Sequence, residues 1–220
     1  MVMRLSKNIL LHVVMEGSLV RFMQVLRVVT AAVLALLVGS EVWGQSAGDY
    51  QTRRDGNWNR NDIWQRYDGT TWVNVATYPG QSAGDGTVTI LDAHEVILNL
   101  SPAYAVGSLI IQQTSATTTG LTVNGTNELD ITGAVTLNPP TGTGNARNTY
   151  LYIDAGTIKC SSVSSSNSVD DDRDCKIRIS TGNLEVAGNV SMGNNAARND
   201  ISFTGAGTLK ISGNFTEAGT

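Results

Sequence analysis

A ten-residue phrase recurs in the second half of this chain, and its spacing limits the possible folds more than any other feature. The copies are TNELDITGAV (126–135), TGNLEVAGNV (181–190) and AGTLKISGNF (206–215). The apolar residue near the middle of the phrase recurs at Leu209, Leu184, Ile158, Leu129 and, more weakly, Leu109. Counted from Leu109 toward Leu209, the intervals between these positions are 20, 29, 26 and 25 residues, and intervals of this size are typical of a solenoid repeat.

A second marker keeps the same phase. Arg is followed by Asn or Asp at 147–148, 173–174 and 198–199, and each pair stands shortly before two apolar residues separated by one polar residue. Those apolar pairs are Leu151/Ile153, Ile177/Ile179 and Ile201/Phe203. Alternation with a period of two is typical of strands.

Three short strands per unit, separated by corners, predict an all-β chain folded as a right-handed parallel β-helix with turns of about 25 residues. Gly133 and Gly188 each stand between two strands, where a tight corner favours a residue without a side chain. An antiparallel sandwich is the alternative, and it also explains the alternation. It does not explain why two independent markers share one period.

The alternation also predicts which side chains fill the interior. From residue 109 onward these are Leu109, Ile111, Leu121, Val123, Leu129, Ile131, Val135, Leu137, Leu151, Ile153, Ile158, Cys160, Ile177, Ile179, Leu184, Val186, Val190, Met192, Ile201, Phe203, Leu209, Ile211 and Phe215. Each contributes about 1.5–3 kcal/mol when buried, which offsets the ordering of corners rich in Ser, Thr and Gly. Lys159, Arg178 and Lys210 fall on the outward side and are interpreted as the ordinary polar face of their strands.

Repeat length varies in one polar loop only, at 138–148, 164–174 and 193–199. Each of these segments lies between the last strand of one turn and the first strand of the next. Insertions confined to one corner project from one side of a solenoid, and such loops are the usual place for binding.

Residues 1–44 differ from the remainder. VVTAAVLALLV (28–38) is a short apolar run that follows Arg21 and Arg27 and precedes GSEVWGQSA. Such a run is too short to span a bilayer, which needs about 20 apolar residues, and its setting predicts a secretory signal peptide. Cleavage is expected before Gln45 or after Ala47, and Met23 gives a signal of ordinary length if it is the true start. An uncleaved membrane anchor is the alternative.

Export with cleavage of the signal peptide would leave an acidic chain without a transmembrane span. Residues 45–220 hold 11 Lys and Arg against 17 Asp and Glu. This balance lacks the basic footprint of a nucleic-acid-binding protein and the basic patch that binds anionic lipid. The predicted location is secreted, extracellular or on the outer cell surface.

Residues 45–86 do not fit the repeat and carry Trp58, Trp64 and Trp72. The first turn of a solenoid has an open apolar end that needs a cap, and aromatic side chains bury a large area there. Residues 45–86 are therefore predicted to form a Trp-rich cap in front of β-helix turns over 87–220. The alternative is an aromatic platform that stacks on sugars.

This segment and the residues that follow it resemble a known group of proteins. The residues that carry it are Gly56-Asn57-Trp58, NDIW (61–64), Pro79, Gly84-Asp85, VTI (88–90) and HEVIL (94–98). Their order resembles secreted bacterial surface proteins in which a Trp-rich segment leads into a parallel β-helix, and it is similar to the eight-glycine domain of some extracellular β-helical proteins. The match covers about residues 54–112 and departs from the usual form at RYDGTTWVNVATY (66–78). The resemblance implies an extracellular or outer-surface location and no catalytic residue.

Few side chains suggest chemistry. His94 is the single histidine after residue 44, which excludes sites with two His ligands in this part of the chain. Cys160 and Cys175 are the two cysteines, and an exported protein favours a disulfide between them; two buried free thiols are the alternative. Asp170, Asp171 and Asp172 are weak calcium candidates because carboxylates suit that ion, although their spacing matches no known calcium loop. A solvated loop is the alternative, and no cofactor is otherwise predicted.

The sequence thus predicts the N-terminal part of a secreted or cell-surface, adhesin-like bacterial β-helix that is non-catalytic and presents loops to an extracellular protein or polysaccharide surface. The alternative is a polysaccharide-active β-helix enzyme, a lyase or glycoside hydrolase, or a carbohydrate-binding module. Because ISGNFTEAGT ends inside a unit, the turns are expected to continue beyond Thr220.

Overall fold

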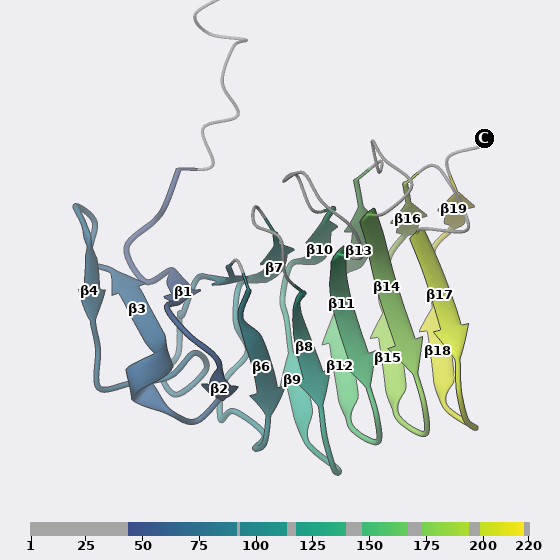
Figure 1. Ribbon diagram of the computed structural model, residues 1–220, viewed down its shortest axis with the longest axis horizontal. Helices are drawn as coiled ribbons and strands as arrows, with labels where there is room; N and C mark the ends of the chain where they lie inside the picture. The colour runs from purple at the N-terminus through teal and green to yellow at the C-terminus, as the bar shows by residue number, and fades with distance from the viewer. Residues whose placement is uncertain are drawn as a thin grey trace, which may run out of the picture. The chain divides into compact units, whose positions relative to one another are not determined.

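The computed structural model describes residues 44–91, 93–113, 118–139, 147–166, 173–193 and 199–217. In these residues the chain is a β-solenoid, in which parallel strands from successive coils stack on one another (Figure 1). The only helix among them is a short 3-10 turn, η1 (Asn61–Ile63). No described helix is long or apolar enough to cross a membrane.

Three sheets form the walls of the solenoid. In spatial order, the nine-stranded sheet contains β19 (Phe215–Glu217), β16 (Val190–Met192), β13 (Ser162–Ser165), β10 (Ala134–Asn138), β7 (Ser108–Gln112), β5 (Thr87–Ile90), β1 (Tyr50–Thr52), β3 (Trp64–Tyr67) and β4 (Trp72–Asn74). The six-stranded sheet contains β17 (Asn199–Phe203), β14 (Arg173–Ile179), β11 (Arg147–Ile153), β8 (Thr119–Val123), β6 (Glu95–Leu98) and β2 (Gly56–Asn57). The four-stranded sheet contains β18 (Thr208–Ile211), β15 (Asn183–Val186), β12 (Thr157–Cys160) and β9 (Glu128–Asp130).

The recurring phrase marks equivalent places on successive coils, as the sequence predicts. Leu129, Ile158, Leu184 and Leu209 are direct register partners along the four-stranded sheet. The prediction for Leu109 is wrong, because this residue pairs with Val88 and Val135 in the nine-stranded sheet. A step of 20 residues is shorter than a coil, so it ends on the preceding wall instead of completing the turn.

The Arg-Asn marker keeps its phase over one step and slips over the next. Asn148 pairs with Asp174, but Asn199 pairs with Cys175. The register follows the buried side chains instead, since Leu151, Ile177 and Ile201 remain partners. A one-residue slip there would turn the apolar set outward.

The interior of the coils is filled as the alternation predicts. Every predicted inward side chain from Leu109 to Met192 is buried, with at most 5 % of its surface exposed. Val163 is also buried, at 1 %, although the alternation predicts no strand there. It stacks between Val135 and Val190, and the same strand brings Ser165 into the position that Leu137 holds one coil earlier.

The last described coil is the exception to this burial. Ile201, Leu209 and Ile211 are only partly buried, and Phe203 and Phe215 are each 52 % exposed. Strands β17, β18 and β19 lie at the ends of their sheets. Their inward side chains therefore cover the coil before them and have no described coil on their other side.

The corners are built on columns of glycine. The amide of Gly133 donates to the carbonyl of Gly107 at 2.6 Å, and a Cβ at Gly133 would lie at the same short distance from that oxygen. At the opposite, N-terminal end of the strands in the four-stranded sheet, a Cβ at Gly182 would meet the carbonyl oxygen of Gly156. Coils stacked this closely leave no room for a side chain, which confirms the predicted corner at Gly133.

At its N-terminal end the solenoid changes its strand pattern. β1 and β2 already pair in parallel with β5 and β6, so the first parallel rungs lie within residues 45–86. β3 then pairs antiparallel with β1, and β4 pairs antiparallel with β3. The parallel ladder of the nine-stranded sheet thus ends at an antiparallel hairpin.

Candidate functional site

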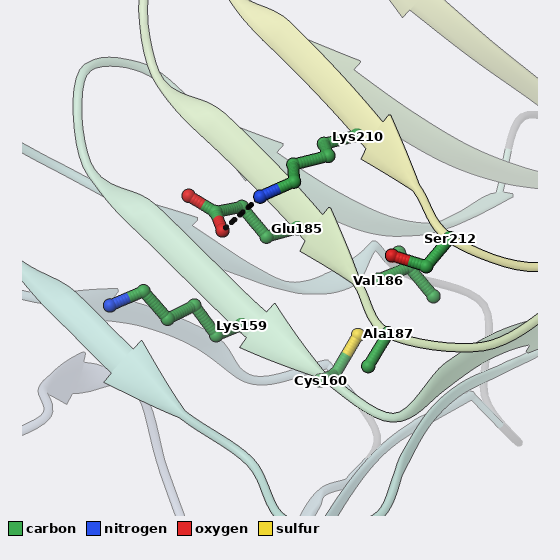
Figure 2. A pocket seen from close by; sticks show the side chains of 7 residues that line it. All are labelled: Lys159, Cys160, Glu185, Val186, Ala187, Lys210 and Ser212. Atoms are coloured by element: carbon green, nitrogen blue, oxygen red, sulfur yellow. Dashed lines mark ion pairs between the residues drawn. The ribbon is translucent and has the colours of Figure 1, made fainter.

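A shallow groove of about 250 Å³ lies on the outer face of the four-stranded sheet (Figure 2). Its lining comes from β12, β15 and β18 and from the residues directly after β15 and β18, on three successive coils. Its lining residues are Lys159, Cys160, Glu185, Val186, Ala187, Lys210 and Ser212.

Charges of alternating sign cross this face from coil to coil. Asp130, Lys159, Glu185 and Lys210 occupy the same register position on β9, β12, β15 and β18. We call this row the charge ladder. Opposite charges on directly paired residues stabilise a sheet, whereas like charges there are destabilising.

The ion pairs within the ladder are long and partly exposed, and Lys159 makes a shorter one with Glu128 beside the ladder. Lys159 Nζ lies 2.6 Å from Glu128 Oε1 and 4.0 Å from Asp130 Oδ1, and Lys210 Nζ lies 3.7 Å from Glu185 Oε2. The hydrogen bond to Glu128 raises the pKa of Lys159, and the neighbouring carboxylates raise it further. Lys159 is therefore a cation at neutral pH. The groove can recognise charge, and Lys159 cannot act as a general base there.

The two thiols are buried and free. Burial raises the pKa of Cys160 to about 11 and that of Cys175 to about 12, so neither provides a thiolate nucleophile near pH 7. The predicted disulfide is not formed in this structure. Cys160 lies on β12 of the four-stranded sheet and Cys175 on β14 of the six-stranded sheet, because a separation of 15 residues is little more than half a coil.

The tryptophans predicted as a cap or sugar platform fall into two groups. Trp58 and Trp64 are fully buried, with ring centroids 5.0 Å apart, and Tyr50 meets Trp64 edge-on at 6.4 Å. We call Tyr50, Trp58 and Trp64 the aromatic cluster. Neither of its indoles offers a face to a sugar. Trp72 is partly exposed on β4 and packs against Tyr67 at 5.4 Å.

The remaining predicted site residues do not come together. His94 Nδ1 lies 2.8 Å from Thr52 Oγ1, near the N-terminal end of the solenoid. Asp170, Asp171 and Asp172 lie outside the described residues. Within the described part of the chain, no group of three or more His, Cys, Asp or Glu side chains could hold a metal ion.

Two features of the structure were not predicted from the sequence. The first is the charge ladder, whose signal was the alternation of Asp130, Lys159, Glu185 and Lys210 directly after the phrase leucine or isoleucine. The second is a stack of Tyr150 on Tyr152, with centroids 4.0 Å apart, on the outer face of the six-stranded sheet.

The environment of the stacked tyrosines is asymmetric. Burial raises the pKa of Tyr150 to about 12, and this ring occupies space that a side chain at Gly120 would fill. Tyr152 is partly exposed, and the guanidinium of Arg178 lies 4.9 Å from its ring centroid. Tyr152 and Arg178 are thus both accessible on this face.

Comparison with known proteins assigns no role to the groove or to the face at Tyr152 and Arg178. No protein-family profile matches the chain, and neither a curated protein nor a solved structure is significantly similar to it.

Proposed function

We propose that this chain forms a secreted or cell-surface, adhesin-like β-helix scaffold, which acts by presenting loops from a rigid solenoid instead of by catalysis. The observation that carries the proposal is the in-register stacking of the coils. Strands β7, β10, β13 and β16 pair directly, as do β8, β11, β14 and β17. The connections between these two sets therefore start and end at one corner of every coil.

Side-chain hydrogen bonds fix the base of these connections. Thr149 Oγ1 donates to the carbonyl of Asn138 at 2.7 Å and joins the two ends of one connection. Gly193 donates its amide to Ser165 Oγ at 2.9 Å and joins the starts of two successive connections. Anchored ends let the sequence between them vary without changing the strand register, which suits a surface of exchangeable loops.

An insertion experiment tests loop presentation. We expect a ten-residue flexible epitope between Asn138 and Arg147 to leave the urea midpoint nearly unchanged and to be bound by its antibody on the folded protein. The matched control carries the same epitope in the tight corner between Ile153 and Thr157, where Gly156 packs against the neighbouring coil. Equal loss of stability in the two variants would contradict the proposal.

Export is the part of the proposal that depends on residues 1–44. The described fold begins at Gly44 and its first strand at Tyr50, so cleavage before Gln45 would remove none of the described strands. We expect a fusion of the chain to an export-dependent reporter enzyme to be active in a Gram-negative host and to yield a mature N-terminus at Gln45. Replacing Leu34 and Leu36 by Arg should abolish both results. Reporter activity without cleavage would favour the membrane anchor.

The right-handedness of the coils and the role of the aromatic residues as a cap are part of the same proposal. A right-handed coil agrees with the strong preference of parallel crossover connections for that hand. The aromatic cluster and the antiparallel hairpin β3–β4 stand where a solenoid needs a cap, and Trp58 and Trp64 donate their indole N–H groups to the carbonyls of Pro79 and Trp58 at 2.9 and 2.8 Å. A cap with satisfied donors closes the apolar end without leaving a buried polar group unpaired.

A second candidate function is polysaccharide binding or cleavage, and the face at Tyr152 and Arg178 favours it. An accessible aromatic ring beside a guanidinium provides one apolar surface and several hydrogen-bond donors, which a sugar can use together. We expect an oligosaccharide bound here to lose affinity in Tyr152→Ala and not in Trp72→Ala. Release of shorter chains from a polysaccharide would show that the chain is an enzyme and would contradict the non-catalytic proposal.

A further inference from the structure

The outer side of strand β1 and of the hairpin β3–β4 gathers amide and aromatic side chains that the proposed function does not use. We call this set the amide–aromatic face, and its members are Gln51, Gln65, Tyr67, Trp72 and Asn74. Side chains of these strands alternate between core and surface. Tyr50, Thr52 and Trp64 are buried, whereas every member of the face is at least partly exposed. The face therefore lies on the outside of the nine-stranded sheet.

The aromatic half of this face is a pair of rings held by the hairpin. Tyr67 and Trp72 are direct partners in the antiparallel register of β3 and β4, and their ring centroids are 5.4 Å apart at an interplanar angle of 57°. The turn that joins them is fixed by Asp68, whose Oδ1 accepts hydrogen bonds from the amides of Thr70 and Thr71, each at 2.8 Å. A short, hydrogen-bonded hairpin thus sets the position of both rings.

The amide half is a chain of hydrogen bonds that crosses three strands. Gln51 Nε2 donates to Gln65 Oε1 at 3.1 Å, and Gln65 Nε2 donates to Asn74 Oδ1 at 3.3 Å. Arg53 Nη1 donates to the same oxygen of Asn74 at 2.9 Å. The described part of the chain offers no partner to the amide nitrogen of Asn74 or to Gln51 Oε1. The face therefore has both donors and acceptors to offer beside two aromatic rings.

Charge is sparse on this side of the solenoid. None of the described strands β5, β7, β10, β13 and β16, which continue the same sheet, contains a charged residue. In contrast, strands of the six-stranded sheet carry Glu95, Lys176 and Arg178, and the four-stranded sheet carries the charge ladder. Beside the face, the guanidinium of Arg53 is already engaged by Asn74. This chemistry favours an uncharged ligand.

The amides of the face belong to one register row that runs along the sheet and is almost entirely polar. Its members, from β4 to β16, are Asn74, Gln65, Gln51, Thr89, Ile110, Thr136, Ser164 and Ser191. Neighbouring strands lie about 4.8 Å apart, so polar groups recur at regular intervals along this side of the molecule. An extended ligand of repeating polar units fits such a row better than a compact ligand does.

We propose that the amide–aromatic face binds an uncharged polysaccharide chain made of flat, β-linked sugar rings. The C–H side of one ring would stack on Tyr67 and Trp72. Its hydroxyl groups, each both donor and acceptor, would bond to Gln51 Oε1 and to the amide nitrogen of Asn74. Further rings would follow the polar row along the sheet. This inference does not rest on loop presentation, and the site lies on a different sheet from the tyrosine–arginine face of the second candidate function.

Isothermal titration calorimetry with the full chain tests the proposed ligand class. The uncharged probes are cellohexaose, xylohexaose and the hexasaccharide of chitin, and the charged counterpart is a hexaglucuronate with the β-1,4 linkage of cellohexaose. We expect saturable binding of at least one uncharged probe. Hexaglucuronate should bind about ten-fold more weakly or less, because its carboxylates would lose hydration on a surface that offers them no unpaired cation.

Variants of the face test which side chains make the contact. Trp72→Ala should weaken the uncharged probe by about ten-fold, because it removes an apolar ring from the contact. Trp72→Phe keeps an aromatic ring and should retain most of the affinity. Asn74→Asp keeps the oxygen that accepts from Arg53 and Gln65 but loses the amide donors, so it should weaken binding by about five-fold.

Two controls separate binding from folding and from the other candidate face. The urea midpoint of each variant shows whether it is folded, and Asn74→Asp, which changes no side-chain volume, reports on the site even if Trp72→Ala disturbs the hairpin. Tyr152→Ala removes an aromatic side chain from the six-stranded sheet and should leave the affinity for the uncharged probe unchanged.

Three results would overturn the proposal. One is the absence of binding for all three uncharged probes at millimolar concentration, and another is a preference for hexaglucuronate. The third is binding that Tyr152→Ala weakens and Trp72→Ala does not, which would favour the second candidate function instead. The epitope insertion reports on loop presentation separately, so failure of this site is distinguishable from failure of the scaffold proposal.

Discussion

At the scale of single residues, burial decides what each tryptophan can do. Trp58 and Trp64 are 0 % exposed and have their indole donors paired with backbone carbonyls. Trp72 lies on β4, the outermost strand of the nine-stranded sheet that also contains Trp64, and it is partly exposed. The sequence predicted a shared role for the three because it gives their spacing and not their depth.

Truncation of these tryptophans should separate the two groups. We expect Trp58→Ala to lower the free energy of unfolding by about 3–5 kcal/mol, because it removes a large buried ring and leaves a cavity. Trp72→Ala, the matched control, should cost about 1 kcal/mol or less. Urea denaturation followed by far-UV circular dichroism measures both. Similar losses in the two variants would mean that Trp72 also belongs to the core.

The thiols give a prediction about reactivity. Since burial raises the pKa of Cys160 to about 11 and that of Cys175 to about 12, neither should react with Ellman's reagent at pH 8 in the folded protein. Two thiols should react in urea without reductant. Finding none there would show that the disulfide predicted from the sequence forms in solution.

The same shifts give a pH dependence. The folded thiols hold their protons above the ordinary pKa of 9.0, so the stabilisation that this gives is complete below pH 9 and is lost as the pH rises toward 11 or 12. The urea midpoint should therefore fall over this alkaline range. In the double variant Cys160→Ala/Cys175→Ala, the fall should be smaller.

At the scale of strands and corners, the close approach of successive coils sets the sequence. Gly156, Gly182 and Gly207 stand in one column, in which a Cβ on each later residue would meet the carbonyl oxygen of the one before. The amides of Asn183 and Thr208 donate to the carbonyls of Gly156 and Gly182 at 2.8 and 2.9 Å. The column is thus part of the hydrogen-bonded contact between coils.

A methyl group in this column should force the coils apart. We expect Gly182→Ala to destabilise the protein by roughly 1–3 kcal/mol, since the new Cβ would meet backbone that has little freedom to move. The control Asn183→Ala, one residue further on, should have a smaller effect, because it removes a single long hydrogen bond to Thr157 at 3.3 Å. Equal urea midpoints for Gly182→Ala and the unmodified chain would exclude a tight corner.

The strands show how much of the fold can be predicted from the sequence alone. Alternation and period predicted the strands around Leu129, Ile158, Leu184 and Leu209 because each coil repeats one local pattern. They failed for Val163, whose serine neighbours conceal the pattern, although its register partners Val135 and Val190 fix its place. Predicting the charge ladder would have required this same register, because only the stacking of coils brings residues 25 to 29 positions apart into contact.

At the scale of the described solenoid, each coil depends on the coils on either side of it. Ile177 is fully buried between Leu151 and Ile201, whereas Ile201 has a partner on one side only and is partly buried. Stability in such a stack is approximately a sum of terms from each unit and its nearest neighbours. The internal coils should therefore be more stable than the last described one.

Hydrogen exchange should reveal this difference as a gradient along the stack. We expect the amides of β11 and β14 to exchange most slowly and those of β17 and β18 much faster, since local opening of the last coil exposes little new apolar surface. Mass spectrometry of peptic fragments measures the rates. Ile177→Ala should cost about 2–5 kcal/mol, and Ile201→Ala, at the same register position, should cost less because part of its side chain already contacts water. Uniform protection with equal costs at these two positions would mean that the edge of β17 is covered in solution.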